Sequence, residues 1–411
     1  MNRLNGKHII LGITGGIAAY KSAELTRRLR DAGAMVRVVM TRGATKFVTP
    51  LTFQALSGNP VHTELLDEDA EAGMGHIELA RWADAILIAP ASANCMAKLA
   101  QGRADDLLTT LCLASEAPLA LAPAMNRVMW GDIATQDNVN TLLQRNVYLY
   151  GPASGSQACG ETGEGRMLEV AELINALSGL FKSGALQGVN VLITAGPTHE
   201  PIDPVRFIGN RSSGRMGFAL AQAAREAGAN VTLVSGPSNE ATPEDVIRID
   251  VETAAQMHQA VMQQVRQHQV FISAAAVADY RPRAASEQKL KKHDAELSIE
   301  LERTEDILLA VAGSSPRPFI VGFAAETENL EANARAKLEN KSLDMIAANR
   351  VGKDANAQDI GFNSEYNALH VLWTNGEQVF QQARKTTLAR ELINLVAHQY
   401  NKNRQHEKNT A

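Results

Sequence analysis

The sequence predicts an α/β fold with two doubly wound parallel-sheet domains. Short apolar runs that suit buried strands alternate along the chain with amphipathic segments of helical spacing. The succession of strand, Gly-containing turn, helix and strand occurs twice, at residues 8–40 and at residues 189–234. The chain has 411 residues. This is too many for one compact domain, since domains usually hold about 100 to 200 residues.

The first domain is expected to begin with a strand at residues 8–13, a turn at Thr14, Gly15 and Gly16, and a helix at residues 17–31. Its other elements are strands at residues 35–40, 85–89, 119–122 and 147–150, and a closing helix at residues 170–180. The strand runs are mostly apolar, which is typical of parallel strands that are buried on both faces.

The second domain repeats this pattern, with a helix expected at residues 216–227 and strands at residues 189–194, 230–234, 270–274 and 319–323. A hydrophilic link at residues 182–185 places the boundary near residue 187, so that the domains span 1–187 and 188–411. From about residue 399 the chain is polar, and we expect a mobile tail there.

Composition narrows the classes of function. The net charge is −5, with 40 basic and 45 acidic side chains mixed along the chain, which does not indicate a nucleic-acid-binding surface. The apolar runs are far shorter than the ~18 residues of a membrane span, and the N-terminus lacks the apolar core of a signal peptide. Cys95, Cys112 and Cys159 show no Cys-x-x-Cys spacing. We therefore expect a cytoplasmic protein with small-molecule partners.

The Gly-containing turns narrow the choice of nucleotide. Gly15 and Gly16 stand where a doubly wound sheet binds phosphate, at the first turn from strand to helix. However, neither half has Gly-x-Gly-x-x-Gly there, and Thr41 and Ser235 follow the second strands in place of an acidic residue. A dinucleotide-dependent dehydrogenase is therefore disfavoured. On these grounds alone, FMN and a nucleoside triphosphate both remain open.

Four sequence blocks in the first half carry a family resemblance. In order they are Gly15-Gly16-Ile17-Ala18-Ala19-Tyr20-Lys21, Pro90-Ala91-Ser92-Ala93-Asn94, Pro123-Ala124-Met125-Asn126-Arg127-Val128-Met129-Trp130, and Ala158-Cys159-Gly160-Glu161-Thr162-Gly163-Glu164-Gly165-Arg166-Met167. Together they resemble the flavin-dependent phosphopantothenoylcysteine decarboxylases. The resemblance implies a flavodoxin-like flavoprotein domain that binds FMN through Gly15, Gly16, Ile17, Ser92, Ala93, Asn94 and Ala124.

The same resemblance implies three catalytic residues. His76 would be the base for oxidation and decarboxylation, Asn126 would bind the substrate carboxylate, and Cys159 would donate the final proton. Taken alone, these residues are more simply interpreted as a capping histidine, a turn asparagine and an inert thiol. Cys95 stands where the family usually has threonine.

The second half carries four further blocks. They are Ile193-Thr194-Ala195-Gly196-Pro197-Thr198, residues 200–217 with Asn210 among them, Ala274-Ala275-Ala276-Val277-Ala278-Asp279-Tyr280, and Gly322-Phe323-Ala324-Ala325-Glu326-Thr327. These are similar to the bacterial, CTP-using phosphopantothenoylcysteine synthetases. The fused arrangement of both halves resembles the bifunctional coenzyme A biosynthesis proteins, which implies a Rossmann-like ligase domain behind the flavoprotein domain.

The second resemblance implies that CTP activates phosphopantothenate as an acyl-cytidylate, with Mg²⁺ offsetting the triphosphate charge. Asn210 would position this intermediate for attack by cysteine, and Lys289 would be catalytic. No metal ligand is assigned. Glu305 is a departure from the family that adds a carboxylate near the nucleotide. The implied nucleotide contacts are Ser273, Ala274, Ala275, Asp279, Lys289, Thr304, Glu305, Asp306, Ile307, Phe323, Lys337 and Lys341.

Three hypotheses for the function follow. The first is a bifunctional enzyme that joins cysteine to phosphopantothenate and then decarboxylates the product to phosphopantetheine. The second is a flavin-binding regulatory or interaction protein, and the third is a chain with one active and one silent half. The presence of His76, Asn126 and Cys159 together favours the enzyme. The resemblance also implies a homo-oligomer, with trimeric flavin domains joined through dimeric ligase domains.

Overall fold

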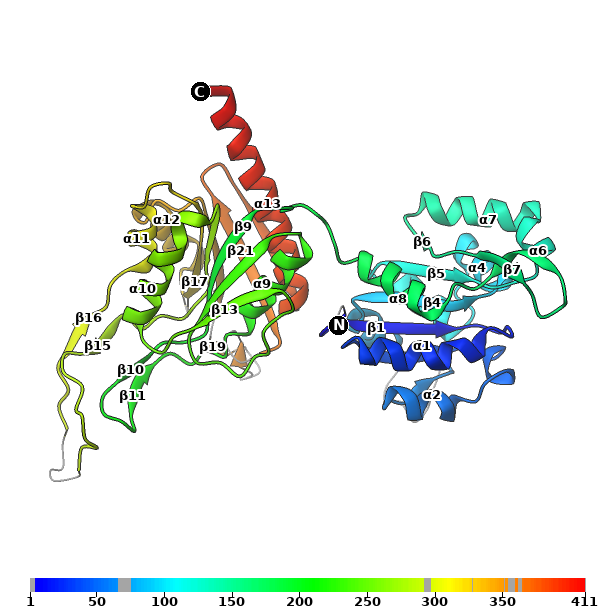
Figure 1. Ribbon diagram of the computed structural model, residues 1–411, viewed down its shortest axis with the longest axis horizontal. Coiled ribbons are helices and arrows are strands. Elements are labelled where there is room, and N and C mark those ends of the chain that lie inside the picture. The colour runs from blue at the N-terminus through cyan, green and yellow to red at the C-terminus, as the bar shows by residue number, and fades with distance from the viewer. Residues whose placement is uncertain are drawn as a thin grey trace. The chain divides into compact units, whose positions relative to one another are not determined.

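The computed structural model describes residues 4–65, 75–291, 297–326, 328–350, 352–353, 359–360 and 364–410. The chain divides into two compact units, Met1–Phe181 and Lys182–Ala411, and each is an α/β structure (Figure 1). Residues before the predicted boundary at 187 already contact the second unit, where Leu186 N donates to Ala227 O at 2.8 Å.

The first unit contains a sheet with helices on both sides. Its strands are β1 (His8–Ile13), β2 (Met35–Met40), β3 (Val61–His62), β4 (Ala85–Ala91), β5 (Leu119–Pro123) and β6 (Tyr148–Leu149), followed by β7 (Ala153–Ser156) and β8 (Thr162–Arg166). Its helices are α1 (Ala19–Asp31), a 3₁₀ turn at Ala44–Lys46, α2 (Pro50–Ser57), α3 (Gly75–Trp82), α4 (Ala93–Gln101), α5 (Leu107–Ala114), α6 (Arg127–Gly131), α7 (Ile133–Gln144) and α8 (Val170–Gly179).

The sheet of the first unit is parallel and has the order β3-β2-β1-β4-β5-β6. Without the two-residue edge strand β3, this is the flavodoxin-like order, so the predicted fold class is confirmed. Side chains of β1 alternate between two cores. Ile9 and Leu11 pack with α1, α2 and α8, whereas Ile10 packs with α3, α4, α5 and α7. Burial on both faces explains why the strand is continuously apolar.

The second unit has the same plan with added strands. Its strands are β9 (Asn190–Ala195), β10 (His199–Pro201), β11 (Phe207–Gly209), β12 (Asn230–Ser235), β13 (Val246–Asp250), β14 (Val270–Ser273), β15 (Tyr280–Pro282), β16 (Leu301–Arg303), β17 (Phe319–Glu326), β18 (Met345–Arg350), β19 (Gly352–Lys353), β20 (Asp359–Ile360), β21 (Tyr366–Trp373) and β22 (Gly376–Arg384). Its helices are α9 (Arg215–Glu226), α10 (Ala254–Gln264), a 3₁₀ turn at Val265–Gln267, α11 (Ile307–Ala312), α12 (Leu330–Asn340) and α13 (Lys385–Thr410).

The main sheet of the second unit has the order β13-β12-β9-β14-β17-β18-β21-β22. Its first six strands are parallel and follow the Rossmann order, as predicted. The predicted parallel sheet is confirmed for these six strands, and two further strands, β21 and β22, join antiparallel at the edge. One face packs against α9 and α13, and the other against α10, α11 and α12.

Two hairpins extend from the second unit at one end (Figure 1). The first pairs β10 with β11, and the second pairs β15 with β16, both antiparallel. We call β15, β16 and the chain between them the arm. Ser286 N on the arm donates to Ile202 O at 2.9 Å, so the two hairpins are hydrogen-bonded to each other.

The expectation of a mobile tail from residue 399 was wrong, because α13 continues to Thr410. Residues 385–410 contain neither proline nor glycine. The polar residues that suggested a tail include several good helix formers, so nothing ends the helix after its apolar part. In the part of the chain that the structure describes, no helix combines the length and the apolar character needed to cross a membrane.

Candidate functional site

The carboxyl ends of β1 and β4 lie next to each other in the parallel sheet of the first unit. These neighbouring strands continue to β2 and β5 on opposite sides, which makes their junction the topological switch point where doubly wound sheets bind ligands. Two loops meet there. Thr14 Oγ1 donates to Pro90 O at 2.7 Å and accepts from Ser92 N at 2.9 Å. The two sequence blocks predicted to bind FMN are therefore joined directly.

The turn after β1 fits a phosphate group. A Cβ on Gly15 would lie 3.0 Å from the carbonyl carbon of Gly43, so the backbone passes too close for a side chain. A Cβ on Gly16 would meet nothing within 4 Å, which leaves open space beside the turn. Ala18 caps α1 without a side-chain acceptor, so no side chain competes for the first amides of that helix.

The second FMN block is held by a helix cap. Ser92 precedes α4, and its Oγ accepts a hydrogen bond from Cys95 N at 3.3 Å. The Cys95 side chain is buried in the core, and burial raises the pKa of its thiol to about 12. The Cys95 side chain, which stands where a threonine was expected, therefore faces the core and not the turn. Ala124 N donates to Ala91 O at 3.0 Å, which places the third block beside the second.

Asn126 and Cys159 lie in direct contact, although 33 residues separate them in the sequence. Asn126 caps α6, with its Oδ1 accepting from Val128 N at 2.8 Å. Its Nδ2 lies 3.4 Å from Cys159 Sγ. Cys159 is exposed and sits in the turn between β7 and β8. The structure thus brings together two of the three predicted catalytic residues of this half.

Glu161 was missed by the sequence analysis as a site residue. Its Oε2 accepts from Asn126 Nδ2 at 2.9 Å and pairs with Arg127 Nε at 3.2 Å. Gln157 fixes the turn from the other end, since its Oε1 accepts from Arg127 N at 3.0 Å. The sequence does contain a signal for this hairpin, because segments rich in small residues lie on both sides of Cys159. These segments form the antiparallel pair β7 and β8.

His76 occupies the first turn of α3 and is half-buried. A helix that connects two parallel strands begins at the carboxyl edge of the sheet, so His76 lies at the same edge as the FMN blocks. Among the described residues, the hydrogen bonds that hold Asn126 and Cys159 involve Gln157, Glu161 and Val128, and none involves His76.

The second unit has its switch point between β9 and β14. The chain after β14 is held by hydrogen bonds from its own amides, since Ala275 N donates to Thr194 Oγ1 at 3.3 Å and Ala278 N donates to Thr198 Oγ1 at 2.9 Å. Thr304 Oγ1 closes the far side by donating to Ala278 O at 2.7 Å. The predicted nucleotide contacts at Ser273, Ala274 and Ala275 thus lie at the end of β14 and in the hydrogen-bonded loop that follows it, here called the rigid loop.

Asn210 joins this rigid loop. Its Nδ2 donates to Ala276 O at 3.1 Å and to Val277 O at 3.0 Å, while the residue itself is exposed. The side chain therefore spans from the end of β11 to the switch point.

Lys337 and Lys341 are anchored, in contrast to the simple interpretation of solvated charges on an exposed helix. Lys337 Nζ donates to Phe323 O at 3.2 Å, and Lys341 Nζ pairs with Asp306 Oδ2 at 2.7 Å. Burial lowers the pKa of Lys337, and the positive charge of Lys341 lowers it further, against the pull of nearby carboxylates that include Asp279. Phe323, Asp279, Asp306 and both lysines therefore form one cluster.

In the Thr304–Ile307 segment, Glu305 and Ile307 do not join the cluster around Lys337 and Lys341. Glu305, the extra carboxylate, pairs with His258 Nδ1 at 3.0 Å on α10. The Glu305 carboxylate is thus held on α10, and it is not among the carboxylates that act on Lys337. The Ile307 side chain is buried in the core, so a contact from this residue to a nucleotide would come from its backbone.

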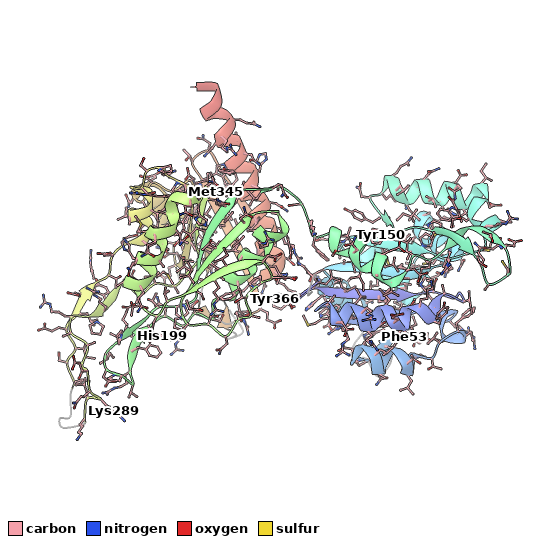
Figure 2. All side chains as sticks on the ribbon, in the orientation of Figure 1. Phe53, Tyr150, His199, Lys289, Met345 and Tyr366 are labelled. Carbon is pink, nitrogen blue, oxygen red and sulfur yellow. The ribbon has the colours of Figure 1, made fainter. Side chains whose placement is uncertain are left out.

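Lys289 lies near the outer end of the arm, away from α12 (Figure 1 and Figure 2). The arm is fastened by Asp203, whose buried Oδ2 accepts from Leu290 N at 3.1 Å and from the Arg206 guanidinium. Arg206 Nη2 in turn donates to Leu290 O at 3.0 Å. The Arg206 guanidinium holds the pKa of Asp203 well below its usual range. Asp203 and Arg206 thus fix the segment that carries Lys289.

In the described ranges, no group of three His, Cys, Asp or Glu side chains could hold a metal ion. The sequence analysis likewise assigned no metal ligands.

The chain matches two protein-family models. Residues 1–182 match the flavoprotein family, and residues 186–400 match the DNA/pantothenate metabolism flavoprotein C-terminal domain. The two matches correspond to the two compact units.

Full-length relatives share both units. The coenzyme A biosynthesis bifunctional protein CoaBC of Vibrio vulnificus (strain CMCP6) is 54% identical over 396 residues, covering 96% of this chain and 98% of the relative. The protein of that name from Escherichia coli (strain K12) is 50% identical over 407 residues, covering 98% and 99%. A crystal structure of the C-terminal domain of a CoaBC protein is 40% identical and covers 53% of this chain and 97% of that one, with a TM-score of 0.45.

Proposed function

The chain belongs to the family of coenzyme A biosynthesis bifunctional proteins, and on that premise we propose a route with two consecutive steps. The second unit uses CTP to condense phosphopantothenate with cysteine, and the first unit decarboxylates the resulting phosphopantothenoylcysteine with FMN. The observation that carries the proposal is the contact between Asn126 Nδ2 and Cys159 Sγ at 3.4 Å. It joins a carboxylate-binding amide to a proton donor.

Decarboxylation needs a sink for the electron pair that remains on the α-carbon. When bound, FMN would take a hydride from the carbon that bears the thiol and return it at the end. Gly15, Gly16 and Ile17 would hold its phosphate, and Ser92, Ala93, Asn94 and Ala124 would lie against its ring. The open space beside Gly16 and the close backbone approach at Gly15 support this assignment.

Three side chains of the first unit would handle protons and the carboxylate. His76, at the carboxyl edge of the sheet, would take the proton from the substrate thiol. Asn126 would bind the carboxylate through a neutral amide, which holds the anion without stabilising it so strongly that loss of carbon dioxide is hindered. Cys159 would then protonate the ene-thiolate that remains.

The second unit would activate a carboxylate that cannot form an amide directly. Phosphopantothenate would attack the α-phosphate of CTP, which releases pyrophosphate and leaves an acyl-cytidylate for cysteine to attack. Lys337 and Lys341 would face the triphosphate, with Asp279 and Phe323 beside the nucleotide. Asn210 would hold the acyl-cytidylate against the rigid loop, and Lys289 would add a charge from the arm.

Several finer assignments belong to the same proposal. Mg²⁺ would accompany CTP without a protein site of its own, in keeping with the absence of a ligand cluster among the described residues. We place the protein in the cytoplasm as a homo-oligomer, with the two activities in domains 1–187 and 188–411. Phosphopantothenate, cysteine and CTP are its small-molecule partners.

Removal of the flavin tests the proposal for the first unit. We expect the untreated protein to be yellow. The flavin-free protein should release no carbon dioxide from phosphopantothenoylcysteine but should still release pyrophosphate from CTP in the presence of phosphopantothenate. Adding FMN should restore carbon dioxide release. A protein that is colourless and remains inactive in decarboxylation after addition of FMN would contradict the assignment.

A further inference from the structure

We propose that Glu161 and the substrate carboxylate bind the Asn126 amide in turn, so that Glu161 controls when Cys159 reaches the substrate. This inference rests on the proposed decarboxylase function and adds a residue to it. Glu161 acts through Asn126 and is therefore a positioning residue.

Both amide protons of Asn126 are already engaged. An asparagine amide offers two N–H donors and one carbonyl acceptor. Nδ2 donates to Glu161 Oε2 at 2.9 Å and lies 3.4 Å from Cys159 Sγ, while Oδ1 accepts from Val128 N at 2.8 Å. A substrate carboxylate can bind this amide only if one of its present partners leaves.

Glu161 is the partner that a carboxylate would replace. Its Oε2 is chemically the same kind of acceptor as a substrate carboxylate oxygen, and it occupies the donor at hydrogen-bonding distance. Two carboxylates at one amide would repel each other, and repulsion of this kind disfavours the second negative charge. The Glu161 side chain is 42% exposed, so it can move into solvent without leaving a buried cavity.

Movement of Glu161 is coupled to Cys159 by the turn that contains both. Gly160 N donates to Gln157 O at 2.9 Å, and Gln157 N donates to Glu161 O at 2.8 Å. Gln157 stays fastened to the segment under the turn, because its side chain accepts from Arg127 N at 3.0 Å and donates to Glu164 O at 3.1 Å. Cys159 and Glu161 therefore belong to one short turn that is hydrogen-bonded to the anchored Gln157 on both sides.

The exchange would order the chemical steps. While the substrate carboxylate holds the amide, Glu161 and the Cys159 thiol are kept away. The C–C bond to the carboxyl carbon then breaks, carbon dioxide leaves as a neutral molecule, and the electron pair is delocalised onto sulfur as an ene-thiolate. Glu161 can then return to Asn126, and Cys159 is brought to the carbon that needs a proton.

The test compares two ligands that differ only in the carboxylate. One is the serine analogue of phosphopantothenoylcysteine, which has no thiol to oxidise, and the other is the same molecule without its carboxyl group. Dissociation constants for both are measured by calorimetry on the full-length flavin-containing protein, wild type and Glu161→Gln. Glutamine can still accept from Asn126 but carries no charge.

The compared quantity is the ratio of the dissociation constant of the decarboxylated analogue to that of the carboxylate analogue. We expect this ratio to be about tenfold larger in Glu161→Gln than in the wild type, which corresponds to the lower end of the range for a hydrogen bond to a charged group. Glu164→Gln is the matched control, because Glu164 Oε2 accepts from Trp130 Nε1 at 3.2 Å in the same hairpin without contacting Asn126. The ratio of the two dissociation constants in Glu164→Gln should equal that of the wild type. Glu161→Ala should shift the ratio in the same direction if the glutamine variant does not fold.

Two other outcomes are distinguishable. If both analogues bind and the ratio is unchanged in Glu161→Gln, the exchange is wrong while the decarboxylase function stands. If neither analogue binds the wild-type protein, the proposed function of the first unit fails and the exchange fails with it.

Discussion

A Cys159→Ser variant is expected to release carbon dioxide once and then stop, with turnover lower by a factor on the order of 1,000, within the range for general acid catalysis. A serine hydroxyl is a far weaker acid than a cysteine thiol, so it does not protonate the ene-thiolate. The hydride is then not returned, and the yellow colour of the flavin should stay bleached. Rapid mixing with phosphopantothenoylcysteine, followed by visible absorbance and trapped carbon dioxide, measures both.

Cys112→Ala is the control for this variant. Cys112 packs against the core of the first unit, and burial raises the pKa of its thiol well above the usual range, so it is not a proton donor. This control should turn over as the wild type does. Normal turnover in Cys159→Ser itself would remove the proton-donor role from the account.

Replacing Asp203 with asparagine is expected to lower the ligase rate by about 10-fold to 100-fold, the value of a few hydrogen bonds to a charged group. Asparagine Oδ1 can still accept from Val205 N and Arg206 N, both at 2.8 Å, so the local turn is kept. Its Nδ2, which can only donate, would take the place of the oxygen that accepts from the Arg206 guanidinium and from Leu290 N. Both of these hydrogen bonds would therefore be lost. The arm, with Lys289, would lose its fastening.

Decarboxylation by the same chain provides an internal control for Asp203→Asn, because the first unit is untouched. Release of pyrophosphate and release of carbon dioxide from added phosphopantothenoylcysteine are measured on one preparation. Asp245→Asn is the matched variant, since Asp245 is an exposed carboxylate that pairs with Arg225 at 3.1 Å, and it should keep both rates. An unchanged ligase rate in Asp203→Asn would show that the fastening of the arm does not matter for catalysis.

Strands that are buried on both faces were predictable because burial leaves a continuous apolar run. The bounds of β1 and β2 agree with the prediction at both ends. The antiparallel pairs β7–β8 and β15–β16 and the edge strand β22 were missed, since they are partly exposed and rich in polar residues or glycine. Their pairing depends on a partner that the local pattern does not reveal.

The same distinction applies to the candidate site. Asn126 and Cys159 could be named from sequence blocks, but Glu161 as their partner depends on a hairpin that returns after 35 residues. The link from Asp203 to the arm spans 87 residues. Lys337 and Lys341 could be placed on a helix from their spacing, but the lowered pKa of Lys337 arises from tertiary burial. The candidate residues within one sequence block could be predicted from the sequence, whereas contacts between distant segments are visible only in the folded structure.

The central claim is that one chain performs both steps in succession. It is tested most directly by incubating the purified full-length protein with CTP, phosphopantothenate and cysteine labelled in its carboxyl carbon, without added phosphopantothenoylcysteine. We predict labelled carbon dioxide that depends on CTP and approaches one molecule per molecule of pyrophosphate. Pyrophosphate release without labelled carbon dioxide would contradict the claim.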